Sequence, residues 1–174
     1  MTVNDIVIRS AREEDLNAIL DIYNDAILNT TAVYSNEPHT LQMRKDWYND
    51  RLKNNFPVFV ADADGVVAGF SSFGHFRQAA GYAYTVEISV YVAIPYRGKG
   101  VSKLLIGALV ARAGEMNLHA LIAGISADNE ISINLHESLG FKEVAYLKEV
   151  GYKFGHWLDL KFFQLLLNNI PGVI

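Results

Sequence analysis

The sequence of 174 residues contains no cysteine, no long apolar run and no excess of positive charge. The absence of cysteine excludes disulfides, thiolate metal ligands and a cysteine nucleophile. No apolar run reaches the roughly 18 residues that a membrane span needs, and the first residues, MTVNDIVIRSAREEDL, are too polar for a signal peptide. A formal net charge of -4 argues against an extended nucleic-acid surface. We therefore expect a cytoplasmic protein that binds neither membranes nor nucleic acid.

The composition is that of a well-packed globular protein. Hydrophobic residues make up 51% of the chain and aromatic residues 11%, which argues against disorder. A chain of this length buries roughly two thirds of the surface that it exposes when unfolded. Because no repeat or linker interrupts the sequence, we expect a single domain over residues 1–174.

The hydrophobic periodicity predicts an α/β fold. A first helix, capped by Ser10 with Glu13 completing a capping box, should run to Leu28. Further helices are expected at 41–54, 100–116 and 129–139, and strands at 6–9, 56–61, 66–74, 82–92, 120–125, 141–150 and 157–167. This order predicts a mixed, mostly antiparallel central sheet with helices on both faces. Its one parallel crossover, through helix 100–116, should be right-handed and should place the site near the end of strand 82–92.

The stretch SVYVAIPYRGKGVSKLL, residues 89–105, passes from a strand to a helix through two glycines. Gly98 and Gly100 lack a Cβ, so the backbone can turn sharply and come close to a bulky anion. The helix N-terminus then offers N–H groups, and Arg97, Lys99 and Lys103 add positive charge. This combination suits a pyrophosphate. Neither a P-loop nor a dinucleotide fingerprint fits the glycine spacing, and an isolated RGKG is equally compatible with an ordinary turn.

The flanking residues favour the anion site. Residues 97–102, Arg-Gly-Lys-Gly-Val-Ser, resemble the acetyl-CoA loop of the GNAT superfamily of N-acetyltransferases, which has the pattern Gln/Arg-x-x-Gly-x-Gly/Ala. Ser102 departs from that pattern at its last position, although serine is small and can itself bond a phosphate. The predicted order of elements is also similar to that of the family. The resemblance implies a GNAT-type fold and an acetyl-CoA-dependent N-acetyltransferase.

Four further stretches resemble one branch of that superfamily, the phosphinothricin and methionine sulfoximine/sulfone acetyltransferases. They are IYNDAILNTTAVY (22–34), TVEISVYV (85–92), ISINLHESLGF (131–141) and GYKFGHWLDLKFFQ (151–164). The resemblance covers about residues 6–165. It implies that the acceptor is the α-amine of a small amino-acid analogue, and that the subunits form a homodimer.

The resemblance also implies the residues that hold the cofactor. Backbone groups of Val90, Tyr91 and Val92 would pair with the pantetheine arm, and Asn129 would hydrogen-bond near it. The pyrophosphate would lie on Arg97, Gly98, Lys99, Gly100, Val101, Ser102 and Lys103.

The same resemblance implies that Glu87 is the general base and that Tyr34, Arg77 and His136 face the substrate. Taken alone, each of these residues is also compatible with an ordinary structural role. Glu87 could be an exposed strand residue and Tyr34 a packed or surface aromatic. Arg77 could be a solvated loop residue and His136 a packed helix residue. His136 stands where many GNAT enzymes carry a tyrosine that protonates the leaving thiolate. The acid therefore stays open between His136, Tyr91 and Tyr146.

No metal site is expected, because His39, His75, His119 and His156 show no metal-ligand spacing. Two other functions stay open: acetylation of a protein N-terminus or a polyamine, and acyl-CoA sensing without catalysis. The basic residue Arg77, shortly before Glu87, favours a carboxylate-bearing small molecule over a polyamine. The retained Glu87 argues against a sensor.

Overall fold

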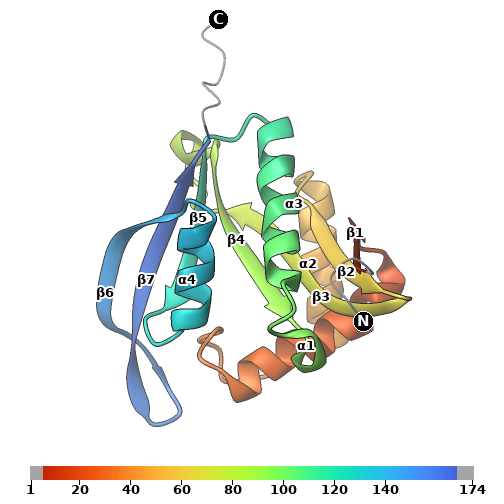
Figure 1. The fold of residues 1–174 in the computed structure, drawn as a ribbon, viewed down its shortest axis with the longest axis horizontal. Helices are drawn as coiled ribbons and strands as arrows, with labels where there is room; N and C mark the ends of the chain where they lie inside the picture. The colour runs from red at the N-terminus through yellow and green to blue at the C-terminus, as the bar shows by residue number, and fades with distance from the viewer. Residues whose placement is uncertain (1–5, 168–174) are drawn as a thin grey trace, which may run out of the picture.

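The computed structural model describes residues 6–167 (Figure 1). Its strands are β1 (Ile6–Ser10), β2 (Val58–Ala63), β3 (Val66–His75), β4 (Thr85–Val92), β5 (Ala120–Ser126), β6 (Lys142–Lys153) and β7 (His156–Leu166). The α-helices are α1 (Leu16–Asn29), α2 (Leu41–Lys53), α3 (Val101–Glu115) and α4 (Glu130–Ser138), and short 3-10 turns are η2 (Glu13–Asp15), η3 (Ala80–Tyr82) and η4 (Ile94–Tyr96). The predicted order of strands and helices is confirmed.

The strands form one seven-stranded sheet in the order β1-β2-β3-β4-β5-β7-β6. Every neighbouring pair is antiparallel except β4 and β5, which α3 connects. Helices cover both faces: Phe70 packs with α1 and α2, whereas Leu105 of α3 packs against the opposite face of β2 and β3. Figure 1 shows α3 and α4 in front of the sheet. The expected mixed, mostly antiparallel sheet is therefore confirmed.

The ladders on the two sides of β4 differ in length. β4 pairs with β3 from Val86 to Val92, but with β5 only from Thr85 to Glu87. Beyond Glu87 the two parallel strands diverge, as Figure 1 shows. The sheet is therefore open along the second half of β4.

The predicted cap of the first helix is wrong. Ser10 ends β1, and the turn η2 separates it from α1. Asp15 is at the N-cap position of α1 but makes no side-chain bond to that helix; its Oδ2 accepts a 2.7 Å hydrogen bond from the backbone N–H of Arg12 and so stabilises the turn η2. Glu13 lies on the surface beside Lys45, at 3.3 Å.

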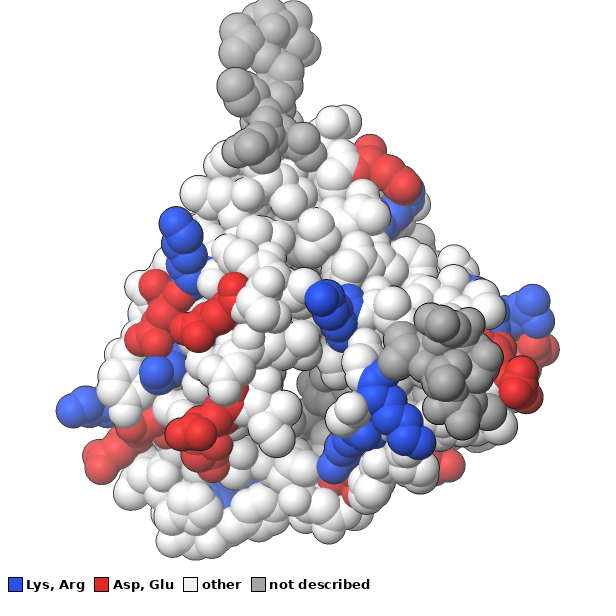
Figure 2. Space-filling model, in the orientation of Figure 1, with Lys and Arg blue, Asp and Glu red and all other residues white. Residues whose placement is uncertain are grey.

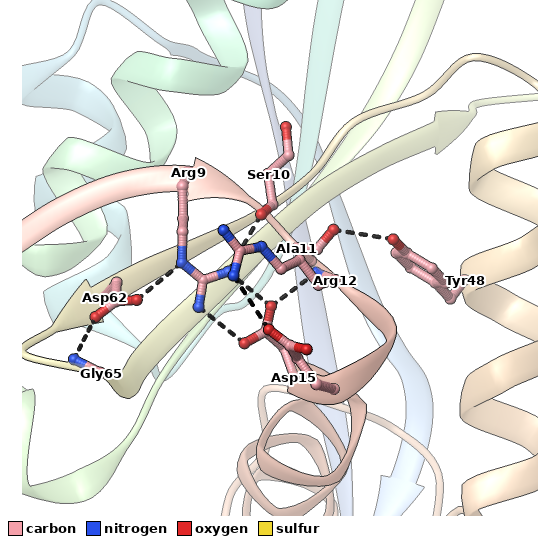
Figure 3. A network of polar contacts seen from close by, with 9 residues as sticks. Arg9, Ser10, Ala11, Arg12, Asp15, Tyr48, Asp62 and Gly65 are labelled. Atoms are coloured by element: carbon pink, nitrogen blue, oxygen red, sulfur yellow. Dashed lines mark hydrogen bonds and ion pairs between the residues drawn. The ribbon is translucent and has the colours of Figure 1, made fainter.

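A tertiary ion-pair network holds the Asp15 carboxylate in position (Figure 3). Both Asp15 oxygens accept from the Arg9 guanidinium, at 2.7 and 2.9 Å, and Arg9 Nε donates to Asp62 of β2 at 2.8 Å. Asp15 is only 6% exposed, and the bonds from Arg9 hold its pKa below the usual range. The network joins β1, β2 and the start of α1. A capping rule that considers only neighbouring residues in the sequence cannot detect it.

None of the described helices is both long and apolar enough to cross a membrane.

Replacing Asp15 by Asn should lower the free energy of unfolding at pH 7 by about 1–3 kcal/mol, because Arg9 loses a charged partner. A carboxyl with a depressed folded pKa stabilises the fold above its unfolded pKa, near 4, and the stabilisation is lost as the pH falls further. The difference between wild type and D15N in urea unfolding should therefore shrink below about pH 4. The exposed control E14Q should change stability by less than about 0.5 kcal/mol. An equal D15N effect at pH 7 and pH 3 would contradict this role.

Candidate active site

The opening between β4 and β5 is part of a cleft of about 980 Å³. Because side chains alternate along a strand, the cleft receives residues from both faces of the sheet. Its α3 and α4 side is lined by Val90, Ser102, Ile106, Asn129 and His136, and its α1 and α2 side by residues 29–32, Arg51, Gly74, Glu87 and Gly124. In Figure 2, Lys and Arg side chains gather at the N-terminal end of α3, beside a hollow. The cleft therefore joins a basic loop on one side of the sheet to a second chamber on the other.

The glycine loop has the geometry that its sequence predicts. Gly98 and Gly100 have φ angles of 73° and 78°, in the left-handed region that favours glycine. Nothing lies within 4 Å of the position that a Cβ on Gly98 would take, so this part of the loop faces open space. The N-terminus of α3 follows directly at Val101. A loop of this shape presents backbone N–H groups and a helix dipole to an anion.

The loop residues divide into lining and supporting groups. Arg97, Gly98 and Ser102 line the cleft, whereas the buried Val101 packs in the core. Arg97 is not free: Nε donates to the Val92 carbonyl at 3.0 Å and Nη2 to Asp25 at 2.7 Å. It therefore anchors the loop to β4 and α1.

The two lysines of the loop lie on its outer side. Lys99 and Lys103 are exposed, and the Lys99 ammonium lies 5.6 Å from the ring centroid of Tyr96. Neither is among the lining residues, so the two lysines would attract a bound anion only through long-range electrostatics.

The open edge of β4 lies next to the loop. Val90, Tyr91 and Val92 all line the cleft beyond the last residue that pairs with β5. Asn129 lines the opposite wall, where its Oδ1 accepts from Ser132 N–H at 3.1 Å and caps α4. An extended ligand arm with amide groups fits this edge as an additional strand would.

Glu87 is at the point where β4 and β5 separate. Its side chain points to the α1 and α2 face between two glycines, its register partner Gly74 on β3 and Gly124 on β5. A Cβ on Gly124 would lie 3.3 Å from Glu87 Oε1. The carboxylate opens into the cleft, yet the surrounding walls desolvate it and raise its pKa, while the positive charge of Arg77 opposes the rise. Glu87 is nevertheless exposed within the cleft, so its carboxylate is accessible to a substrate or to water.

His136 lines the cleft but is poorly suited to donate a proton. Its Nδ1 lies 2.8 Å from the Ser132 carbonyl oxygen, which can only accept, so Nδ1 carries the hydrogen. Burial lowers the pKa of His136 and favours the neutral ring, whose Nε2 is then an acceptor. The geometry supports a pocket wall rather than the acid that protonates a thiolate.

The two tyrosines considered as alternative acids differ in position. Tyr91 lines the cleft, but its ring packs against Tyr23 and Phe70 with centroids 5.2 Å apart in each pair, and burial raises its pKa. Tyr146 donates to the Asp159 carboxylate on β7, and it is not among the lining residues. Neither is arranged to release a proton readily.

Tyr34 and Arg77 do not line the cleft among the described residues. The Tyr34 hydroxyl donates to the Asp159 carbonyl at 2.9 Å, and its ring occupies the space above Gly151, where a Cβ would overlap it. The Arg77 guanidinium lies 4.8 Å from the centroid of Phe76. Tyr34 therefore fastens its loop to β6 and β7, and Arg77 acts on Glu87 through its charge.

Several site residues carried no signal in the sequence. Gly74 and Gly124 lie on either side of Glu87, and Arg51 of α2 lies against Gly74 in the same cleft. Lys153, only 2% exposed, donates to the carbonyls of Thr30 and Val33 at 2.7 and 2.6 Å and also to Ile27. Lys153 thereby holds the loop after α1 that forms one wall. Arg51 and the two glycines lie outside the recognised stretches, and Lys153, inside the stretch 151–164, is far in sequence from the carbonyls it binds, so only the fold reveals these contacts.

Comparison with known proteins agrees with this geometry. The family profile described as "Acetyltransferase (GNAT) domain" matches residues 8–161. The chain belongs to the GNAT acetyltransferase family. It is 46% identical over 162 residues to an L-methionine sulfoximine/L-methionine sulfone acetyltransferase of Pseudomonas aeruginosa, covering 92% of this chain and 94% of the relative. The predicted resemblance to that branch is confirmed.

Two solved structures extend the comparison. A GNAT superfamily phosphinothricin acetyltransferase from Sinorhizobium meliloti in complex with acetyl-CoA superposes with a TM-score of 0.91, at 34% identity over 94% of this chain and 89% of that one. A structure described as ribosomal-protein-alanine N-acetyltransferase from Brucella melitensis also has a TM-score of 0.91, at 47% identity, covering 92% and 99% of the two chains. This GNAT protein is therefore an acetyl-CoA-dependent N-acetyltransferase, as its sequence predicts.

The shape of the cleft is itself compatible with acetyl-CoA, independently of these relatives. The space at Gly98 is open, and the edge of β4 beyond Glu87 is not paired with β5, so a phosphate group and an arm with amide groups would each fit. Within residues 6–167, no group of three or more His, Cys, Asp or Glu side chains is placed to hold a metal ion.

Replacing Gly98 by Ala should raise the KM for acetyl-CoA about 5- to 30-fold, because a left-handed φ costs an alanine roughly 1–2 kcal/mol. The matched control is G107A on α3, where a Cβ also meets nothing within 4 Å but φ is ordinary. Steady-state kinetics with varied acetyl-CoA measures both variants. An unchanged KM in G98A would show that the loop shape does not contribute to cofactor binding.

Proposed function

We propose that this GNAT enzyme transfers acetyl from acetyl-CoA to the α-amine of a small amino-acid analogue, such as phosphinothricin or methionine sulfoximine or sulfone, with Glu87 as general base. The observation that carries the proposal is the position of Glu87, where the two sides of the cleft meet. The Pseudomonas aeruginosa relative supports the acceptor class.

Acetyl-CoA supplies the acetyl group as a thioester. The acceptor arrives as an ammonium and must lose a proton before it can attack the carbonyl. Glu87 accepts that proton, directly or through one water, and its raised pKa brings it closer to that of the amine. The leaving group departs as a thiolate, a weak base compared with an alkoxide or amide ion, so it can leave without a strong acid and take its proton from water.

The remaining predicted residues take supporting roles in this proposal. Residues 97–103, with Gly98 and Ser102 nearest the cleft, hold the pyrophosphate; Val90, Tyr91 and Val92 pair with the pantetheine arm, and Asn129 bonds beside it. His136 lines the pocket. Tyr34 shapes the acceptor side through its loop, and Arg77 tunes Glu87.

A second candidate is acetylation of a protein N-terminus, which the description of the Brucella melitensis structure favours. The α-amine chemistry would be the same, so the acceptor alone distinguishes the two functions. A polyamine is a poorer fit, because Arg51 lies in the acceptor side of the cleft.

A homodimer is supported by the surface of β6 and β7. Eight large apolar or aromatic side chains of these strands and their connecting turn are at least 40% exposed: Val144, Tyr146, Leu147, Val150, Tyr152, Phe154, Trp157 and Leu166. Clustered apolar surface of this kind commonly marks an interface. The cytoplasmic location stays a prediction from the sequence.

The acceptor class is tested by following CoA release with a panel of amines. Methionine sulfone, methionine sulfoximine and phosphinothricin should be turned over with kcat/KM at least about tenfold above spermidine and an alanine-initiated peptide. A preference for the peptide would replace the proposed acceptor with the second candidate.

Replacing Glu87 by Gln should lower kcat by about 100-fold or more with the best acceptor, since a general base contributes roughly 10²–10⁴. The KM for acetyl-CoA should stay within about twofold, because this role of Glu87 is confined to the acceptor. The matched control E143Q changes a surface glutamate on β6. Normal turnover by E87Q would remove Glu87 as the base.

The pH profile provides an independent check. Glu87 acts as a base only when deprotonated, so kcat/KM should rise through a pKa above the ordinary value near 4.5. Arg77 lowers that pKa, so R77Q should move the rising limb to higher pH. A shift to lower pH, or none, would contradict the electrostatic role of Arg77.

A further inference from the structure

The acceptor side of the cleft contains a cation that sequence comparison did not single out. The charged side chains that line the cleft are Arg51, Glu87, Arg97 and Asp128. Arg97 is paired with Asp25 beside the glycine loop. Arg51 is therefore the one Lys or Arg among the described lining residues on the α1 and α2 side of the cleft, where Glu87 lies.

Register places the Arg51 guanidinium at the residue on β3 that pairs with Glu87. Gly74 on β3 is the direct partner of Glu87 on β4, so both face the same side of the sheet. A Cβ on Gly74 would lie 2.8 Å from Arg51 Nη2 and 2.9 Å from Cζ. The guanidinium thus occupies the position that a side chain at residue 74 would fill, one strand away from Glu87.

Arg51 is held in place but is incompletely paired. Its Nη1 donates to Asp50 at 2.7 Å, and its Cζ lies 5.6 Å from the Trp47 ring centroid. Nε is buried and has no hydrogen-bond partner. The side chain is 23% exposed, with its open part in the cleft. Such a fixed guanidinium is suited to bind a carboxylate.

We propose that Arg51 binds the carboxylate of the acceptor and so selects an α-amino acid over an uncharged amine. The proposal rests on the proposed acceptor class. The amine and carboxylate of an α-amino acid share one carbon. Glu87 projects from β4, and the guanidinium of Arg51, from α2, lies against Gly74 on the adjacent strand β3. Glu87 takes the amine while Arg51 holds the carboxylate. Arg77, outside the lining, acts through its charge.

The test compares methionine sulfone with its α-carboxamide, in which an uncharged amide replaces the carboxylate, at a pH where both α-amines are in the same protonation state. Wild type should prefer the acid in kcat/KM by about 10- to 100-fold, the range of a hydrogen bond to a charged group. R51Q should reduce this preference to within about threefold of unity, with little change in the KM for acetyl-CoA. The control R112Q, a partly exposed arginine paired with Glu115 outside this cleft, should keep the wild-type preference.

The preference is a ratio measured on one preparation, so loss of folded protein affects both acceptors equally. If R51Q gives no active protein, G74A tests the same contact, because its Cβ displaces the guanidinium; the preference should fall there too. A wild-type preference in R51Q, or its loss in R77Q alone, would overturn the inference. Equal use of acid and amide by wild type would also overturn it and leave the acetyltransferase proposal standing. Failure to acetylate either acceptor would overturn both.

Discussion

The early end of the β4–β5 ladder is the constraint on which the site depends. Two parallel strands that stay paired would close the sheet, but these pair only from Thr85 to Glu87. The backbone edge of β4 beyond that point is left for a ligand, and the opening connects the two faces of the sheet. The glycine loop then continues from this strand into α3, which places the proposed pyrophosphate site at one end of the opening. Glu87 lies at the other end.

The acceptor side is built by groups that hold one another in place. Gly74 and Gly124 leave room on both sides of Glu87, and Arg51 fills the first of these spaces. Lys153 donates to the backbone carbonyls of Ile27, in the last turns of α1, and of Thr30 and Val33 after the helix, without a carboxylate among these partners. Burial lowers the pKa of this lysine, a cost that the three hydrogen bonds offset. The walls are therefore positioned by long-range contacts and not by local turn preferences.

Loop anchoring explains why conspicuous cations do not all face the ligand. Arg97 has a carbonyl of β4 and a carboxylate of α1 as partners, which fixes the loop between two elements. Lys99 and Lys103 remain outside the cleft lining, where they contribute a screened positive field. The shape of the anion site thus comes from backbone at Gly98 and Gly100, with side-chain charge in support.

The sequence by itself determined the order of elements, the mixed sheet, the glycine loop and the family, because each is recorded in local periodicity or in contiguous motifs. It misplaced the first helix cap, since Asp15 is selected by Arg9 and Asp62, which come from two strands. It also could not reveal that Tyr34 is fastened over Gly151 or that Arg51 lies above Gly74. These contacts join residues that are 117 and 23 positions apart. Only the tertiary structure decided them, because strand register and helix packing determine which side chains share one space.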